Sequence, residues 1–346
     1  MRRSALAAAA LLSIAFTSVD AAPRWALVVH GGAGVIDRTS LTAAQDAAYR
    51  AALARATESG ALVLRAGGSA LEAVEATIVV MEDDPLFNAG RGAVFTASGR
   101  NELDAAIMDG RSLEAGAVAG VTRTRHPVSL ARRVMQKSPH VLLVGPGADA
   151  FSLEQGLEQV EPGWFFTERR WRELEQALNA KALPIPPRPP GIPVEPPHDG
   201  LSHGEGKQGT VGVVALDQHG NLAAGTSTGG TTAKRWGRVG DSPIIGAGTY
   251  ASNTSCAVSA TGAGEYFIRL TVAREICALV EYKGMKLQAA ADEIVRNRLT
   301  ALGGTGGVIA LTPDGQLAWS FNTSGMYRAR LADGQPLTVG IYGDDP

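Results

Sequence analysis

The stretch GTVGVVALDQHGNLAAGTSTGG, residues 209–230, decides how this chain folds. An apolar run from Val211 to Leu216 is followed by a turn sequence at 218–220, and a second apolar run then leads back to TSTGG. Two short β-type runs joined by a glycine-containing turn predict a hairpin. GGVIALTPDGQLAWSFNTSGM, residues 306–326, repeats the pattern, and two similar hairpins can pair into one sheet.

Helical patterns surround these hairpins. An alanine-rich pattern follows HGGAG (30–34) and ends near Leu64, and the capping box formed by Ser69 and Glu72 predicts a helix to about Met81. Further helices are expected over 168–183, 265–281 and 285–302. Because these helices cluster instead of alternating with strands, the pattern argues against a doubly wound parallel sheet. It favours an α+β fold with a layered antiparallel core and helices outside.

The composition indicates a globular protein that acts on small solutes. The 346 residues are 45% apolar and 19% charged, which is enough to bury a large core. A formal net charge of -2 gives no broad basic surface for nucleic acid, and no basic amphipathic stretch suggests a membrane surface. We therefore expect a small-molecule substrate, with no nucleic-acid partner.

Residues 1–21 resemble a secretory signal peptide. Two arginines precede an apolar run and a small-residue site at Val19-Asp20-Ala21, so cleavage is expected after Ala21 or Ala22. The mature protein would then have no membrane segment and would be secreted, in the periplasm if the source is a Gram-negative bacterium. The two cysteines, Cys256 and Cys277, cannot build the fold, and their spacing leaves open whether they pair.

A proline-rich tract begins at Pro184 and leads directly to Gly209-Thr210. Its composition predicts an extended, poorly packed linker. A chain break before Thr210 would place the hydroxyl of Thr210 beside its own α-amine, whose pKa is about 8 and which can act as a base. The linker would let the upstream tail move away from the new N-terminus.

Other chemistries fit the sequence less well. GTSTG (225–229) matches a serine-hydrolase elbow, but no helix pattern follows it and all six histidines precede Ser227. No histidine pair has helical ligand spacing, and no Cys/His cluster indicates a metal. Threonine remains the best candidate nucleophile.

The motifs together resemble the plant-type asparaginases, also called isoaspartyl peptidases, of the N-terminal nucleophile hydrolases. They are HGGAG (30–34), PLFNAGRGAVFT (85–96), ELDAAIMDG (102–110), GTVGVVALD (209–217), TSTGG (226–230), GRVGDSPIIGAGTYA (237–251), SATGAGE (259–265) and FNTSGMYR (321–328). The resemblance implies a four-layer αββα sandwich that cuts itself between Gly209 and Thr210. It implies an α subunit of residues 22–209 with a flexible proline-rich tail (184–209), a β subunit of residues 210–346, and a dimer of αβ units.

The same resemblance implies a role for each matching residue. Thr210 matches the nucleophile, Thr228 a hydroxyl that steadies it, and Thr261 with the amide of Gly262 the oxyanion hole. Arg238 and Asp241 match the groups that hold the substrate's α-carboxylate and α-ammonium. GRVGD (237–241) agrees with this role, since a zwitterionic substrate needs one fixed cation and one fixed anion, and the glycines within the motif suggest a backbone held for a ligand. Gly264 and Asn88 match further residues at the substrate site.

The loop MEDDPLFNAGR (81–91) resembles the family's sodium-binding loop. The resemblance implies a structural sodium ion held by backbone carbonyls of Met81, Glu82, Asp84, Phe87, Ala89 and Arg91. No organic cofactor is expected.

The leading hypothesis is an amidohydrolase that cleaves L-asparagine and β-aspartyl dipeptides through a threonyl acyl-enzyme. A glycosylasparaginase would share the chemistry, although that branch usually places Asp before the nucleophile, where this chain has Gly209. A non-catalytic periplasmic binder of zwitterionic amino acids is the alternative of another class, and it would need no chain break.

Overall fold

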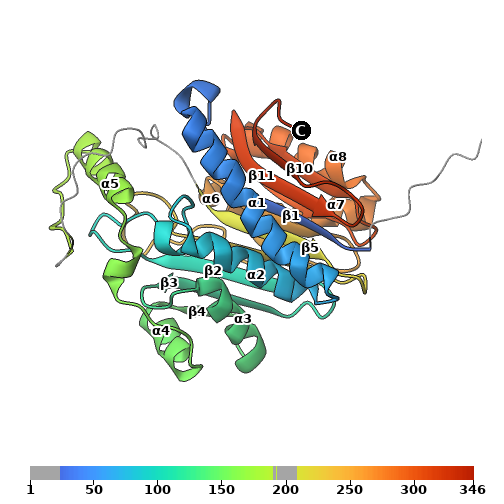
Figure 1. Ribbon diagram of the computed structural model, residues 1–346, viewed down its shortest axis with the longest axis horizontal. Coiled ribbons are helices and arrows are strands. Elements are labelled where there is room, and N and C mark those ends of the chain that lie inside the picture. The colour runs from blue at the N-terminus through green and yellow to red at the C-terminus, as the bar shows by residue number, and fades with distance from the viewer. Residues whose placement is uncertain (1–23, 190–191, 193–208) are drawn as a thin grey trace, which may run out of the picture.

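The computed structural model describes residues 24–189, 192 and 209–346 (Figure 1). The predicted signal peptide and most of the proline-rich tract lie outside the described residues. Within the described residues, no helix combines the length and the apolar character that crossing a membrane requires.

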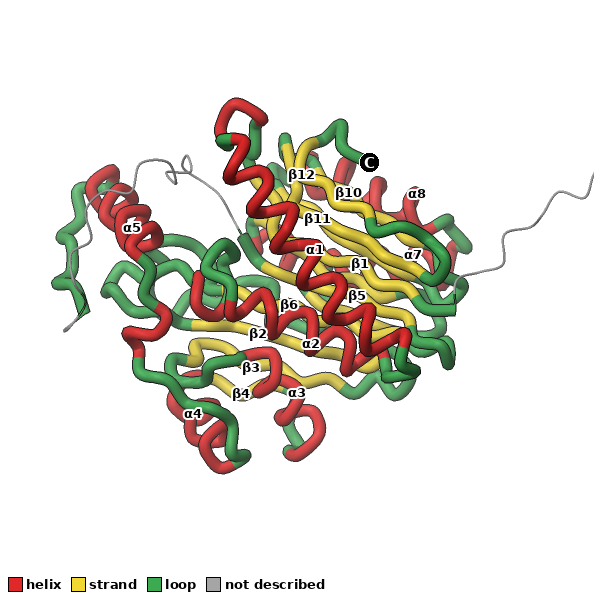
Figure 2. Tube along the Cα trace, viewed as in Figure 1, coloured by secondary structure: helices red, strands yellow, loops and turns green. Residues whose placement is uncertain are grey.

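Two sheets form the centre of the fold (Figure 2). The larger sheet has the strand order β12-β11-β1-β5-β6-β2-β3-β4, and the smaller has the order β10-β9-β8-β7. Every pairing is antiparallel except that of β3 with β4. The strands are β1 (Ala26–Gly34), β2 (Leu103–Asp109), β3 (Ala115–Val121), β4 (Leu142–Val144), β5 (Val211–Leu216), β6 (Leu222–Thr228), β7 (Thr249–Ala251), β8 (Ala257–Gly262), β9 (Gly306–Leu311), β10 (Leu317–Phe321), β11 (Gly325–Ala332) and β12 (Thr338–Tyr342).

Helices cover both outer faces of the sheet pair, so the chain forms the expected four-layer αββα sandwich. Figure 1 shows α1 and α2 lying across the large sheet, with α7 and α8 beyond the other strands. One apolar core lies between α1–α3 and the large sheet, a second between the two sheets, and a third between the small sheet and α6–α8. The helices are α1 (Ala43–Arg65), α2 (Ala70–Asp83), α3 (Pro127–Lys137), α4 (Gly145–Glu154), α5 (Glu168–Ala180), α6 (Gly264–Leu270), α7 (Val272–Lys283) and α8 (Leu287–Asp292), which continues as a π-helix over Glu293–Leu299.

Local sequence signals explain several boundaries. The predicted capping box is present: Ser69 Oγ accepts from the Glu72 backbone, and the Glu72 side chain accepts from the Ser69 backbone. Thr42 and Gln45 make an equivalent box at the start of α1, which the sequence analysis did not identify. The expected helix over 265–281 is two helices, because Thr271 adopts a left-handed conformation with φ 47°.

One further expectation needs correction. The hairpin β5–β6 lies in the large sheet and the hairpin β9–β10 in the small one, so the two similar hairpins face each other across the central core instead of pairing. The described start of the proline-rich tract has no regular structure, yet it is anchored. Arg188 binds both carboxylate oxygens of Glu168 at 2.7 and 2.9 Å, and its guanidinium lies 5.7 Å from the ring of Trp171. The tract is therefore fixed on α5 up to this point.

The question of the cysteines is answered by the structure. Cys256 and Cys277 form a disulfide with Cα atoms 5.2 Å apart, which joins the start of β8 to α7. Both residues are fully buried.

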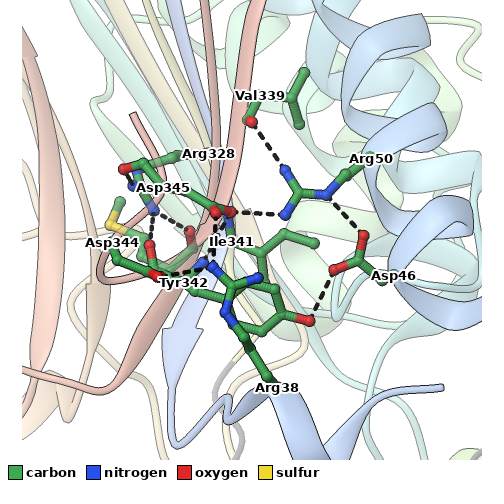
Figure 3. A network of polar contacts seen from close by, with 10 residues as sticks. Arg38, Asp46, Arg50, Arg328, Val339, Ile341, Tyr342, Asp344 and Asp345 are labelled. Atoms are coloured by element: carbon green, nitrogen blue, oxygen red, sulfur yellow. Dashed lines mark hydrogen bonds and ion pairs between the residues drawn. The ribbon is translucent and has the colours of Figure 1, made fainter. Parts of the chain in front are cut away.

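The C-terminus is held by a polar network between α1 and β12 (Figure 3). Oδ2 of Asp345 accepts hydrogen bonds from Arg50 Nη2 at 2.7 Å and from the backbone of Ile341 at 2.8 Å. Arg328, a fully buried residue of β11, donates to the carbonyl of Tyr342. These contacts tie the last residues to the first helix.

Candidate active site

The bond between Gly209 and Thr210 lies where β5 begins, inside the large sheet. In the uncleaved chain, Oγ1 of Thr210 lies 2.9 Å from Oγ1 of Thr228, and both residues are buried. Thr228 ends β6, the strand next to β5, so the hairpin predicted from the sequence brings the two hydroxyls together. The Thr228 hydroxyl also accepts from the backbone N–H of Gly230 at 3.0 Å, which fixes its orientation.

Asn88 connects the loop after α2 to the predicted cleavage site between Gly209 and Thr210. Its backbone N–H donates to the carbonyl oxygen of Gly209 at 3.1 Å, and its side-chain amide donates to the carbonyl of Gly230 at 2.8 Å. Asn88 is fully buried. A donor on the Gly209 oxygen is positioned to stabilise negative charge that develops there when a nucleophile attacks the carbonyl carbon.

His30 is a site residue to which the sequence analysis gave no role. Its Nδ1 lies 3.1 Å from the carbonyl oxygen of Thr210, and its Nε2 lies 2.9 Å from Oγ of Ser259. Burial lowers the pKa of His30 to about 3, so the ring is neutral at neutral pH. A carbonyl can only accept, so Nδ1 carries the proton and donates to Thr210, while Nε2 accepts from the Ser259 hydroxyl.

A chain of buried hydroxyl groups extends the contact between His30 and Ser259 into the small sheet. Ser259 Oγ lies 2.7 Å from Oγ1 of Thr226, which in turn accepts from Thr249 at 2.7 Å. With Nε2 of His30 as the acceptor at one end, the consistent direction of donation runs from Thr249 through Thr226 and Ser259. The backbone of the predicted nucleophile is thereby fixed to both sheets.

Gly212 makes this arrangement possible and is the sequence signal that could have revealed it. Gly212 pairs with His30 in the register of β1 and β5. A Cβ at position 212 would lie 1.9 Å from Ser259 Oγ and 2.2 Å from His30 Nε2. Only glycine at this position lets the histidine and the serine meet across β5.

The predicted clamp residues are brought together around Gly264. A Cβ on Gly264 would lie 2.8 Å from Asp241 Oδ1 and 3.0 Å from Arg238 Nη2, so glycine is required for the three to pack. Oδ2 of Asp241 is buried and has no hydrogen-bond partner among the described residues. Burial raises the pKa of Asp241 to about 7, although the nearby Arg238 cation opposes the shift. An ammonium group would supply the missing partner.

Glu265 is a second residue that the sequence analysis gave no role of its own. Its carboxylate accepts from Arg238 Nε at 2.9 Å and from Nη2 at 3.1 Å. The remaining edge of the guanidinium, at Nη1, faces Gly240 and Gly230, whose added Cβ atoms would lie 2.8 and 3.5 Å away. The two glycines leave that edge accessible to a carboxylate.

The predicted oxyanion residues end β8. Thr261 is fully buried, and its Oγ1 accepts from the backbone N–H of Ala33 at 3.4 Å. Thr261 and Ser259 lie on the same face of β8 because side chains alternate along a strand. Since Ser259 contacts His30 beside Thr210, this face places Thr261 toward the candidate nucleophile. Gly262 ends β8, and only Ala263 separates it from α6.

Two carbonyls of the predicted sodium loop pack closely against glycines. A Cβ on Gly90 would lie 2.2 Å from the oxygen of Glu82, and a Cβ on Gly92 would lie 1.9 Å from the oxygen of Phe87. Backbone carbonyl oxygens are the donor type that suits a hard cation such as sodium. The side chain of Glu82 is directed elsewhere, because its Oε1 accepts from Ser227 Oγ at 2.6 Å. This contact also shows that Ser227 faces α2 and not Thr210.

Fold and site together define an N-terminal nucleophile hydrolase whose candidate nucleophile is a threonine at a strand start. The chain belongs to the asparaginase family, whose model, described as "Asparaginase", matches residues 23–341. It is 49% identical over 317 residues to the isoaspartyl peptidase of Salmonella typhimurium, covering 91% of this chain and 98% of that protein. It is 48% identical over 316 residues to the isoaspartyl peptidase of Escherichia coli, covering 91% and 95%.

A plant relative is similar over the same part of the chain, at lower identity. The chain is 41% identical over 328 residues to the probable isoaspartyl peptidase/L-asparaginase 2 of Arabidopsis thaliana, covering 92% of this chain and 99% of that protein. These relatives identify the chain as an enzyme, so the comparisons do not favour a non-catalytic binder.

Proposed function

We propose that this enzyme hydrolyses L-asparagine and β-aspartyl dipeptides after cutting its own chain before Thr210. The observation that carries the proposal is the 2.9 Å contact between Thr210 and Thr228 beside a scissile carbonyl that already has a donor from Asn88. The names of the relatives support the substrate class, and none of those cited is a glycosylasparaginase.

The first step is self-cleavage. Oγ1 of Thr210 attacks the carbonyl carbon of Gly209, and the Asn88 N–H stabilises the oxyanion. Collapse of this intermediate passes the Oγ1 proton to the Thr210 nitrogen, breaks the C–N bond and leaves an ester, which water hydrolyses to a Gly209 carboxylate and a free Thr210 amine. His30 holds the Thr210 carbonyl in place while the ester forms and while water hydrolyses it.

Substrate hydrolysis repeats this chemistry on a β-amide. Arg238 binds the α-carboxylate through its Nη1 edge, and Asp241 binds the α-ammonium. The neutral amine of Thr210 accepts the hydroxyl proton, Oγ1 attacks the β-carbonyl, and Thr261 with the Gly262 amide stabilises the oxyanion. The amine then gives the proton to the departing nitrogen, and water cleaves the aspartyl ester.

A denaturing gel of purified protein tests the mechanism. Wild-type protein incubated without proteases is expected to give two chains, whereas Thr210→Ala should stay as one folded chain without activity. Intact wild-type protein that still hydrolyses asparagine would contradict the role of Thr210. Hydroxylamine added with asparagine should yield β-aspartyl hydroxamate, because it captures the ester.

A sodium ion in the loop would stabilise the structure and take no part in the reaction. The carbonyls of Glu82 and Phe87, with those of Met81, Asp84, Ala89 and Arg91, would hold it. Its charge would fix the loop that carries Asn88. We propose no catalytic step through it.

We also propose that the mature protein works in an oxidising compartment, the periplasm in a Gram-negative host. The buried disulfide between Cys256 and Cys277 supports this, since such bonds persist outside the reducing cytoplasm. Mass spectrometry of the exported protein should find an upstream chain that begins after Ala21 or Ala22.

A dimer of αβ units completes the proposal. Apolar side chains at the open edge of the large sheet support it, since Val141, Leu142 and Val144 are 52%, 40% and 59% exposed. Light scattering during size-exclusion chromatography would give twice the mass of one αβ unit, and the mass of one unit would contradict it.

A further inference from the structure

A small cavity adjoins Gly209, the glycine of the proposed cleavage site. Backbone atoms of the HGGAG strand line one side of it, and two neighbouring arginines of α5 line another. The lining includes Gly31, Ala33, Gly34, Tyr327, Arg169, Arg170 and Gly209 itself. Apart from Gly209, none of these residues contributes a side chain to the chemistry proposed above.

Arg170 is the lining residue with an unused donor. Arg170 is 5% exposed. Its Nε donates to the carbonyl of Gly92 at 2.7 Å, and its Nη1 donates to the Glu173 carboxylate at 2.8 Å. We find no hydrogen-bond acceptor for its Nη2 among the described residues. This atom lies 3.8 Å from the position that a Cβ of Gly209 would take.

Arg169 differs in this respect. Its Nη2 donates to the carbonyls of Pro85 and Leu86 at 2.6 and 3.2 Å, so it holds the loop after α2. Arg170 therefore presents the free guanidinium edge, and Arg169 adds positive charge behind it.

The proposed mechanism fixes what enters this space during hydrolysis, and the inference rests on that mechanism. The departing nitrogen must lie next to the Thr210 amine, because the amine gives it a proton. In the uncleaved chain that amine is the nitrogen of the scissile bond, and Gly209 is attached to it. The leaving residue of a substrate therefore extends into the volume that Gly209 occupied, toward Arg170.

Asparagine and β-aspartyl dipeptides differ in the group that they release. Asparagine releases ammonia, which cannot reach a second site. A β-aspartyl dipeptide releases an amino acid whose α-carboxylate is two bonds from the departing nitrogen. A guanidinium edge suits a carboxylate, and such charge-assisted hydrogen bonds are about twice as strong as neutral ones.

We propose that Arg170 forms a subsite for the free α-carboxylate of the leaving residue. The enzyme then favours dipeptides that end in this carboxylate over peptides in which the group is amidated or continues as a chain. Gly209 blocks the subsite in the precursor and opens it when the chain is cut.

The test compares β-aspartyl-leucine with its C-terminal amide on cleaved wild-type enzyme. The acid should have the higher kcat/KM by roughly 10- to 100-fold, the range expected for one buried charged hydrogen bond. In Arg170→Gln the ratio of the two kcat/KM values should fall toward one. The ratio is the readout, because general damage to the site lowers both values.

Two variants keep the test decisive. Arg172→Gln, on the same helix and paired with Glu168 at 3.0 Å, should keep the wild-type ratio. Arg170→Lys keeps the positive charge but lacks the paired donors of the guanidinium, so it should give an intermediate ratio. This variant provides the test if Arg170→Gln fails to fold. Equal rates on acid and amide in wild-type enzyme would overturn the subsite. Absence of hydrolysis of asparagine and of both dipeptides would instead contradict the proposed function.

Self-cleavage creates a second carboxylate that could bind Arg170, at the new C-terminus on Gly209. If it stays on Arg170, wild-type enzyme will show no preference for the acid. Removal of Gly209 from the α chain by carboxypeptidase would then create the preference. That pair of results would overturn the assignment to the leaving residue.

Discussion

The carboxylate of Glu265 binds the guanidinium of Arg238 at two atoms, Nε and Nη2, and leaves Nη1 facing two glycines. Glu265 stands in the first turn of α6, and its side chain is 61% exposed. An exposed pair of this kind adds little to stability, so its importance is in fixing which edge of Arg238 meets the substrate.

Glu265→Gln is therefore expected to raise KM for asparagine by roughly fivefold while kcat changes little, because an exposed ion pair is worth up to about 1 kcal/mol. Steady-state kinetics on the cleaved enzyme measure both values. Glu275→Gln, which loses a comparable exposed pair with Arg298, is the control and should leave KM unchanged. A kcat loss without a KM change would contradict the role given to Glu265.

Gly212→Ala should slow self-cleavage by at least about tenfold and lower the free energy of unfolding by about 1–3 kcal/mol, the cost of overpacking. The new methyl group cannot fit between His30 and Ser259, so the Thr210 carbonyl loses its fixed position. A timed denaturing gel and urea unfolding measure the two effects. Gly147→Ala in α4, where a Cβ meets nothing within 4 Å, is the matched control. Cleavage of Gly212→Ala at the wild-type rate would remove the His30 contact from the mechanism.

Activity on asparagine should depend on the Asp241 carboxylate. Its pKa is raised to about 7, so below that pH the group is protonated and cannot pair with the substrate's ammonium. Above it, the charged form binds. With the Thr210 amine titrating near ~8, log kcat/KM should rise with a slope of two at low pH. Asp241→Asn should reduce the slope to one, and an unchanged slope would exclude Asp241 from substrate binding.

Asp345→Asn tests the network at the C-terminus. The pKa of Asp345 is lowered to about 2, chiefly by hydrogen bonds from the Ile341 backbone and Arg50 that outweigh burial. A lowered pKa stabilises the fold above the unfolded value near ~4, and this stability is lost as pH falls toward 2. The variant should unfold about 1–2 kcal/mol more easily at pH 7, with the difference vanishing near pH 2.

Asp344→Asn is the control for that measurement. Asp344 pairs with Arg38 at 2.8 Å, but its side chain is 73% exposed. Urea unfolding should show little effect at either pH. Equal losses in the two variants would mean that the buried contacts of Asp345 contribute nothing specific.

Local patterns predicted a layered antiparallel core with helices outside and singled out Thr210, whereas the four layers and the role of Thr228 were implied by the family resemblance. The hairpin 209–230 carries the candidate nucleophile Thr210 and Thr228 on adjacent strands, so its turn fixes their contact. GRVGD (237–241) places a cation and an anion in one short loop, which makes the clamp visible without a structure.

Other site residues depend on contacts that no local pattern encodes. Ser259 and Thr226 are ordinary strand residues until two sheets stack and bring them to His30. Glu265 reads as an acidic residue favoured at a helix start, and Arg170 lies in a highly charged helix where one more arginine carries no signal. The error about the hairpins has the same origin, since sequence similarity does not say which sheet a strand joins.

The strand order of the large sheet has a consequence for the life of the mature enzyme. Strands β1 and β2 precede the cut, yet they flank β5 and β6, which follow it. The proposed cut would therefore leave two interleaved polypeptides that cannot separate without unfolding the sheet. The precursor would fold as one molecule, whereas the denatured mature enzyme would have to find its partner chain again, so its recovery would depend on concentration. Folding would be completed once, before the cut, and the lifetime of the mature enzyme would then be set by its rate of unfolding.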